Sequence, residues 1–583
     1  MKRRILLFVL IILPLFVYSL DYYPLSQIKE GMILKGKTVL KGDRLSEFKV
    51  KVTGILSNVY PDKNFIIGEI EGDYYKETGV IAGMSGSPVY YNGKIVGAVS
   101  FSFPFTKRAI AGITPYEDMI STEKKTAPEV DIKIELKDIY NGEIIRELKR
   151  KLSERAVNFG FFKIPLKASG FSSEIIKRMS KDFSPFHFTA IPASSSGTIK
   201  IPEKIDESAI TLRDGDAINV HLMIGDFDLS AGGTVTHVKG DNFYAFGHPF
   251  FNLGKIEYPV SKAKIIGVVP SYESSFKLSS VERYIGKIIA DRTSAIVGKI
   301  GSFPDLIPMK ITMNYLKPKE FEIKMVRDKL LTPLLVYNAL ANVISSEIKA
   351  VGELSLKVEG TIYLRNGKSV VYNDIFSSAD TAGEFSILYA SLAYILMDNP
   401  VKEFSIDRIE ISISPYEKKR VAVLKKVISE KYRVSPGEEV RFSLYYKPLK
   451  EKMKKEELAI MVPPFERGSI LYIFIADAKS MQDFETKKYQ GGFKFPDNEA
   501  SLLRALNNLR KNDIVYLKIF ALKKSVFLNG YDYSGIPSSV FKLILPSQKD
   551  YNFTFPNISI VKEYALPIDY KFEGKALIKL EIK

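Results

Sequence analysis

The chain of 583 residues contains no cysteine and only four histidines. The absence of cysteine excludes disulfide bonds, thiolate metal sites, iron–sulfur clusters and a cysteine nucleophile. With so few histidines a histidine-rich metal centre is not expected either, so the sequence predicts no metal ion and no cofactor. The histidines that remain as candidate catalytic bases are His187, His221, His237 and His248.

Long apolar runs are also missing, except at the N-terminus. Three basic residues at positions 2–4 precede an uncharged apolar stretch over residues 5–20. This layout is typical of a secretory signal peptide, which we expect to span residues 1–20 and to be cleaved. The stretch is shorter than the roughly 20 residues that cross a bilayer, and an uncleaved anchor is the alternative. We expect an exported protein that is periplasmic, extracellular or anchored at the envelope.

Acidic residues are outnumbered by basic ones, which gives a formal net charge of +17. Loss of residues 1–20 would remove three positive charges and leave +14. In an exported chain this charge favours an anionic envelope surface over nucleic acid as a partner. A solvated, lysine-rich surface explains the charge equally well, and nothing in the sequence indicates an oligomeric state.

Strand patterns and turn signals dominate the chain. Between residues 22 and 120, short apolar strands alternate with glycine and Asn/Asp turns, and Asn92-Gly93 marks a two-residue hairpin. Strands return over residues 209–311 and again beyond residue 408. The length and an apolar content of 46% suggest three or four domains with proper cores. The spacing of apolar residues predicts helices over residues 144–152, 174–179, 330–348, 383–397 and 499–509.

Residues 78–89 read TGVIAGMSGSPV and contain the most informative motif of the chain. Glycines on both sides of Ser85 allow a sharp turn that would expose its hydroxyl group. The usual geometry of a G-x-S-G-x-P turn would aim the amides of Gly83 and Ser85 at a developing oxyanion. The alternative is an ordinary glycine-rich turn in which the serines bond the backbone. The neighbouring residues of the motif are Gly86, Ser87 and Pro88.

A serine nucleophile needs a base. His248 lies in the stretch YAFGHPF, on a glycine turn between apolar strands and far along the chain from Ser85. Only tertiary structure can bring the two side chains together. The other three histidines fit strands or an aromatic cluster, so they are the weaker candidates.

These two motifs carry a family resemblance. Residues 81–99 resemble the nucleophile region of the SpoIVB sporulation peptidases, which are serine proteases of the chymotrypsin-like class. Residues 228–236, leading to Phe246-Gly247-His248, resemble the strand pair that ends in the catalytic histidine of that family. Residues 279–286 resemble a further stretch of the same domain. The resemblance covers roughly residues 30–120 and 215–305.

The resemblance implies roles for particular residues. Ser85 would be the nucleophile and His248 the general base, with an acidic third member that holds the imidazole tautomer. Alignment back from Thr78 places Glu71 where the family has aspartate, and Asp73 is the reserve candidate. In those peptidases the histidine half precedes the serine half, so the resemblance also implies that the two halves are permuted here.

Two functions remain open at this point. The first is an exported serine endopeptidase of the SpoIVB type, which would act on protein or peptide substrates and possibly on itself. The second is a catalytically inactive scaffold or binding protein of the cell envelope that keeps the peptidase fold. A glutamate in the acid position, the reordered halves and the long β-rich remainder favour the second.

We therefore expect a mainly β protein, in which a permuted two-lobed β-barrel peptidase domain carries helical insertions and a C-terminal β-sandwich-like module follows. The expected divisions are the signal peptide (1–20), the serine-bearing half (21–125), a helical insertion or linker (126–208), the histidine-bearing half (209–315), a mixed α/β region (316–419) and the C-terminal module (420–583).

Overall fold

The structure is a computed structural model. It describes residues 21–60, 63–121, 135–155, 164–193, 210–348, 354–416, 418–488, 496, 498–523, 525–528, 531–533, 539–540, 553–554 and 558–583. The expected signal peptide lies outside the described residues. No helix of the described ranges is long and apolar enough to cross a membrane.

The N-terminal strands close into a six-stranded barrel, which we call the first barrel. Alternating buried and exposed residues along its strands place one face of each strand in the barrel core, as in β1. The predicted Asn92-Gly93 hairpin is confirmed, because it joins β4 to β5. The elements are β1 (Ile33–Lys41), β2 (Arg44–Tyr60), β3 (Lys63–Glu71), α1 (Asp73–Thr78), β4 (Pro88–Tyr91), β5 (Lys94–Ser102), β6 (Ile110–Pro115) and α2 (Tyr116–Ile120).

A second ring of six strands lies within a larger, 13-stranded sheet. Its strands pair in the order β9, β12, β13, β14, β11 and β10, and an additional pairing of β9 with β10 closes the ring, which we call the second barrel. The prediction of a two-lobed β-barrel fold is therefore confirmed. The strands are β9 (Ala217–Gly225), β10 (Asp228–Lys239), β11 (Asn242–Ala245), β12 (Gly254–Val269), β13 (Phe276–Arg292) and β14 (Ala295–Ile300).

The segment between the two barrels contributes helices and two further strands. β7 pairs with β10 at the edge of the second barrel, and β8 pairs with β7. Helix α3 begins after Gly142 and buries an apolar stripe of Ile144, Ile145, Leu148 and Leu152. The elements are α3 (Glu143–Glu154), β7 (Ile164–Ser169), α4 (Ser173–Asp182) and β8 (Phe188–Pro192).

The middle region extends the same sheet and covers it with two apolar helices. β16 pairs with β9, and β15, β19, β17 and β18 follow outward. The helices α5 and α6 pack on each other and are buried almost throughout, as their predominantly apolar sequences require. The elements are β15 (Ile307–Met313), β16 (Lys319–Met325), α5 (Leu331–Glu347), β17 (Ser355–Leu364), β18 (Ser369–Phe376), α6 (Thr381–Met397) and β19 (Ile406–Tyr416).

The C-terminal module packs a four-stranded sheet against a five-stranded sheet around one apolar core, so the predicted sandwich is confirmed. A further three-stranded sheet consists of β26, β27 and β28. The elements are β20 (Val421–Ser429), β21 (Arg433–Val434), β22 (Glu439–Pro448), β23 (Lys454–Met461), β24 (Ile470–Ala476), α7 (Ala478–Lys488), α8 (Glu499–Asn507), β25 (Ile514–Ala521), β26 (Val526–Leu528), β27 (Tyr531–Tyr533), β28 (Phe553–Thr554), β29 (Ser559–Pro567), β30 (Lys571–Glu573) and β31 (Lys575–Ile582).

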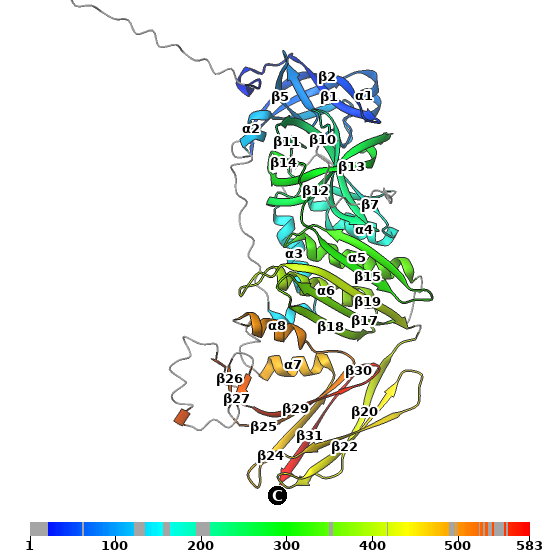
Figure 1. Ribbon diagram of the computed structural model, residues 1–583, viewed down its shortest axis with the longest axis vertical. Coiled ribbons are helices and arrows are strands. Elements are labelled where there is room, and N and C mark those ends of the chain that lie inside the picture. Colours follow the sequence, from blue (N-terminus) through cyan, green and yellow to red (C-terminus); the bar gives the residue numbers. More distant parts are fainter. Residues whose placement is uncertain are drawn as a thin grey trace, which may run out of the picture.

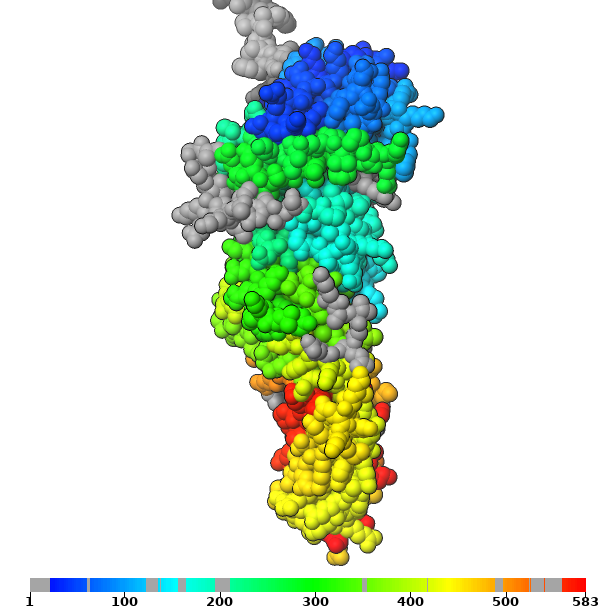
Figure 2. Space-filling view, turned by 90° about the vertical axis from the view of Figure 1, so that its right-hand side faces the viewer, coloured from blue at the N-terminus to red at the C-terminus, as the bar shows by residue number. Residues whose placement is uncertain are grey.

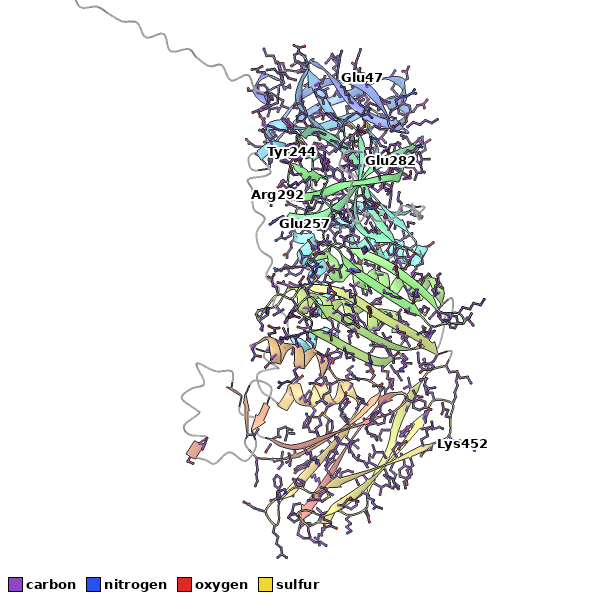
Figure 3. All side chains as sticks on the ribbon, in the orientation of Figure 1. Glu47, Tyr244, Glu257, Glu282, Arg292 and Lys452 are labelled. Carbon is purple, nitrogen blue, oxygen red and sulfur yellow. The ribbon has the colours of Figure 1, made fainter. Side chains whose placement is uncertain are left out.

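The molecule is elongated (Figures 1 and 2). The first barrel caps one end, the second barrel and the middle region follow, and the C-terminal module forms the other end. Figure 3 places Tyr244 of β11 where the two barrels meet, and its ring lies 5.9 Å from that of Tyr116 in α2. The junction between the two barrels holds both sequence motifs.

Candidate active site

Ser85 lies in the loop between α1 and β4, at the face of the first barrel that meets the second. The loop turns because Gly83 and Gly86 adopt positive φ angles of 96° and 91°. The amide of Met84 donates to the carbonyl of Ile81, and that of Ser87 donates to Met84. We call residues 81–87 the serine turn.

Strand β10 of the second barrel holds the serine turn in place. The amide of Thr234 donates to the Ser85 carbonyl at 2.8 Å, and the Thr236 hydroxyl donates to the Gly86 carbonyl at 2.8 Å. A side chain at Gly86 would overlap the Thr234 carbonyl oxygen. The turn therefore needs glycine at this position both for its conformation and for the contact between the barrels.

The hydroxyl group of Ser85 and the two amides of the proposed oxyanion site have no hydrogen-bond partner among the described residues. The Ser85 side chain is 5% exposed and makes no hydrogen bond with another described residue. Within the same ranges, the amides of Gly83 and Ser85 have no acceptor. By contrast, the Ser87 hydroxyl is fully buried and donates to Thr38 Oγ1 at 2.9 Å. Of the two serines, Ser85 is the one with an uncommitted hydroxyl group.

The histidine motif forms a second turn directly beside the serine turn. It follows β11, and Phe246 and Gly247 both adopt left-handed conformations, with φ of 69° and 70°. The Thr114 hydroxyl of the first barrel donates to the Gly247 carbonyl at 2.7 Å. A left-handed phenylalanine is strained, and such strain persists only where surrounding contacts enforce it. We call residues 246–249 the histidine turn.

His248 is buried in a neutral, base-competent form. Its Nδ1 lies 2.7 Å from the Pro249 carbonyl, which can only accept, so the proton is on Nδ1. Its Nε2 is then an acceptor, and this atom is buried without a hydrogen-bond partner in the described structure. Burial lowers the pKa of His248 to about 4, and the bond to Pro249 opposes this only in part.

The His248 ring faces a cavity of about 520 Å³, measured with its opening to solvent. Aromatic and apolar side chains line most of it, including Phe65 and Phe101 of the first barrel and Phe250 beside the histidine. Ser85 is not part of the lining, and no hydrogen bond joins Ser85 to His248. The structure thus brings the two turns into contact without joining the two side chains.

Neither predicted acid contacts His248. Glu71 is exposed at the end of β3. Asp73 begins α1, where its carboxylate is 96% exposed and pairs with Lys76 at 2.7 Å. The position that an acid would take, next to Nδ1, is filled by the Pro249 carbonyl.

Sequence reasoning missed the carboxylate that supports the histidine turn. Asp291 of β13 is fully buried and accepts from the amides of Phe250 and Phe251 at 2.7 and 2.6 Å. Burial raises its pKa to about 6, and these amides oppose that rise. Its signal in the sequence is a lone aspartate in an apolar strand, which marks a buried polar role without naming the partner.

The remaining histidines have structural surroundings. His221 lies between Asp228, at 3.1 Å from Nδ1, and Ser261, at 2.8 Å from Nε2, in the order of a catalytic triad. Ser261 and His221 are both fully buried in strands, however, so no substrate can reach the hydroxyl group. His237 bonds Asp214 at 2.9 Å. His187 lines the His248 cavity, and its Nε2 is also buried without a partner among the described residues.

The part of the chain that the structure describes contains no set of metal ligands. No three histidine, aspartate or glutamate side chains in it gather around one point.

No curated protein and no solved structure matches the chain. Residues 21–116 match the family model of the SpoIVB peptidase S55. This match spans all six strands of the first barrel and includes Ser85, and it ends before His248. At family level it supports a SpoIVB-type serine peptidase. The first barrel is thus the part of this chain that is similar to the SpoIVB peptidase S55 family.

Proposed function

We propose that the protein is an exported serine endopeptidase of the SpoIVB type, with Ser85 as its nucleophile. The observation that carries this proposal is the coincidence of the family match with the barrel that presents the serine turn. The uncommitted Ser85 hydroxyl and the two amides without acceptors supply further support. Protein or peptide chains are the proposed substrates, and self-cleavage is a further proposal.

His248 is the proposed general base. In the mechanism, its Nε2 accepts the Ser85 proton as the oxygen attacks a peptide carbonyl carbon. The amides of Gly83 and Ser85 donate to the resulting oxyanion. The imidazolium then protonates the leaving amine, and water hydrolyses the acyl-enzyme by the same route. Catalysis requires the Ser85 and His248 side chains to approach on substrate binding, since apo enzymes often hold such pairs too far apart.

The third role of the triad is where this chain departs from the family pattern. Glu71, with Asp73 as reserve, was predicted to orient the imidazole. In the proposed mechanism the Pro249 carbonyl fixes the tautomer instead, because it accepts from Nδ1. A neutral carbonyl stabilises the imidazolium less than a carboxylate does, so we expect slow turnover.

Substitution tests the proposal. Mature protein and Ser85→Ala would be incubated with a denatured protein substrate and followed for self-cleavage. We expect Ser85→Ala to abolish both activities, and the matched variant Ser87→Ala, whose hydroxyl is committed to Thr38, to keep them. Proteolysis that survives in Ser85→Ala would refute the assignment.

An inactive envelope scaffold is the second candidate function. The missing hydrogen bond between Ser85 and His248 favours it, as does the exposure of Glu71. An anionic envelope surface is a proposed partner under either function, and its binding would weaken steeply with added salt.

A further inference from the structure

A second cavity borders the serine turn and shares no lining residue with the His248 cavity. It encloses about 300 Å³ with its opening to solvent, and Ala82 and Gly83 form part of its wall. The opposite wall comes from the second barrel and from β7. Small residues, among them Ala217 of β9 and Gly232 of β10, leave the space open. Two lysines, Lys167 and Lys277, supply its cationic groups.

Lys277 is packed directly against the serine turn. Its amide donates to the Ala82 carbonyl at 3.0 Å, and a side chain at Gly83 would meet its methylene groups at 3.2–3.4 Å. Its ammonium group bonds the hydroxyls of Thr38 at 2.7 Å and Thr234 at 3.4 Å. The residue is 6% exposed and forms no ion pair with any described carboxylate. Burial lowers its pKa to about 7.

Lys167 lies in the same cavity, on β7. Its ammonium group bonds the Asn219 amide oxygen and the Ser279 hydroxyl, and it is 6% exposed. It too forms no ion pair with a described carboxylate. Burial lowers its pKa to about 8, with Asp228 acting in the opposite direction. Asp228 is already bonded by His221 and by Ser230.

Two buried ammonium groups without paired carboxylates are costly, because burial removes their hydration without a compensating charge. An anion bound between them would offset that cost. Gly232 adds a second observation, since a Cβ atom there would lie 3.4 Å from Lys167 Nζ, in contact with the ammonium group. Cavity, cations and glycine lining together describe an anion site beside the nucleophile.

We propose that this cavity binds a carboxylate group of the peptide substrate, held by Lys167 and Lys277. The inference rests on the proposed function for its substrate class, because the cavity shares the Gly83 segment with the proposed oxyanion site. The carboxylate comes either from an acidic side chain next to the scissile bond or from the C-terminus of the peptide. Both sources present the same planar anion to the two ammonium groups.

The proposal predicts a pH dependence with a definite sign. Both lysines must be protonated to bind a carboxylate, and the charged groups facing them are the bound anion and, at Lys167, Asp228. Affinity should therefore be highest near pH 6, where the lysines are charged and glutamate is ionised. It should fall as the pH rises through about 7 and 8.

Calorimetric titration of the mature full-length protein tests this without requiring catalysis. The probes are acetyl-Ala-Glu-amide against acetyl-Ala-Gln-amide, and acetyl-Ala-Ala with a free against an amidated C-terminus. We expect one acidic probe to bind at least about tenfold more tightly than its neutral partner at pH 6, equivalent to about 1.4 kcal/mol. A preference for the first or the second pair identifies the source of the carboxylate.

Variants complete the experiment. Lys167→Met and Lys277→Met should each remove the preference, and Lys35→Met, at an exposed position of β1, should keep it. The pH series on the unmodified protein serves as the test if a variant fails to fold. Equal binding of acidic and neutral probes at pH 6, or a preference that survives in both lysine variants, would overturn the inference. Fluorophosphonate labelling of Ser85, measured separately, decides the proposed function on its own.

Discussion

Single residues with unusual backbone conformations fix the geometry of the candidate site. Gly86 has a positive φ and lies against the Thr234 carbonyl oxygen, while Phe246 is left-handed at the start of the histidine turn. Non-glycine residues rarely adopt positive φ angles unless surrounding contacts hold them there. The two turns therefore depend on each other, and disturbing one backbone should disturb the other.

Substitution of Gly86 tests this dependence. Gly86→Ala would strain the backbone and force β10 away from the serine turn, so we expect a loss of more than about 2 kcal/mol in stability. Gly93→Ala is the matched control, because Gly93 has a φ of 79° and open space around it. Thermal midpoints of both variants check the prediction, and equal midpoints would contradict it.

His248 should titrate far below an ordinary histidine. Its pKa is about 4 in the folded protein against 6.5 for the ordinary side chain. The unfolded chain then binds the extra proton first, so stability is full above about pH 6.5 and is lost as the pH falls toward 4. The loss is on the order of 3 kcal/mol. The loss of stability between pH 7 and pH 4.5, measured from unfolding curves, should be smaller in His248→Gln than in the unmodified protein. An equal loss in the two proteins would contradict the lowered pKa of His248.

The two turns of the candidate site could be predicted from the sequence, whereas the distant residues that contact them could not. The glycines around Ser85 and before His248 marked both turns, because tight turns need glycine locally. Lys277 had no local signal, and the signal of Asp291 did not name its partners, since each residue acts through a partner far along the chain. Burial of these two side chains is a property of the closed barrels.

Strands at the barrel junction are joined by one carboxylate, that of Asp214. Tyr90 of β4 donates to Asp214 Oδ2 at 2.8 Å, and the same carboxylate accepts from the Val238 amide at 3.0 Å and bonds His237. Burial tends to raise the pKa of Asp214, but the bonds from His237 and Tyr90 lower it overall. The Asp214 carboxylate therefore stabilises the folded protein fully above the ordinary pKa of 3.8. This stabilisation is lost as the pH falls through the lower pKa of the folded state.

Removal of this carboxylate should loosen the junction. Asp214→Ala leaves a tyrosine hydroxyl, a histidine and a backbone amide without their acceptor, and we expect a loss of about 1–3 kcal/mol. Asp483→Ala, at an exposed position of α7, is the control and should have little effect. Urea midpoints of the two variants at pH 7 measure the difference in stability. Equal midpoints would show that the junction does not depend on Asp214.

Periodic elements were predictable because their signals are local. The apolar spacing located α3, α4, α5 and α6, and alternation with turn residues located the barrel strands. Strands β7 and β8 were not predicted, because they are short strands at the sheet edge and contain Pro165 and Pro192. Their pairing depends on β10, a strand far along the chain.

At the scale of the whole molecule, the C-terminal module is coupled to the rest through α8. The module has a core of its own, but Leu502, Leu503 and Leu506 of α8 belong to the core of the barrels and middle region. Asn507 at the end of α8 accepts from the Val371 amide of β18 at 2.8 Å. The chain is thus a continuous stack in which α8 anchors the module, together with hydrogen bonds from Asn512 to Asp374 and from Lys571 to the Ser377 carbonyl.

Loss of this anchor should weaken the middle region. Leu506→Ala removes a fully buried side chain, and we expect a loss of about 2–4 kcal/mol together with faster proteolysis between the module and the middle region. Leu577→Ala, whose leucine is 53% exposed on β31, is the matched control. Similar proteolysis of the two variants would show that α8 does not couple them.

The central claim is that Ser85 is an activated nucleophile. Its most direct test is a fluorophosphonate probe applied to mature protein, with Ser85→Ala and His248→Gln beside it and the labelled residue located by mass spectrometry. We expect labelling of Ser85 that is absent in Ser85→Ala and strongly reduced in His248→Gln. A folded protein in which Ser85 stays unlabelled would contradict the claim and favour the inactive envelope scaffold.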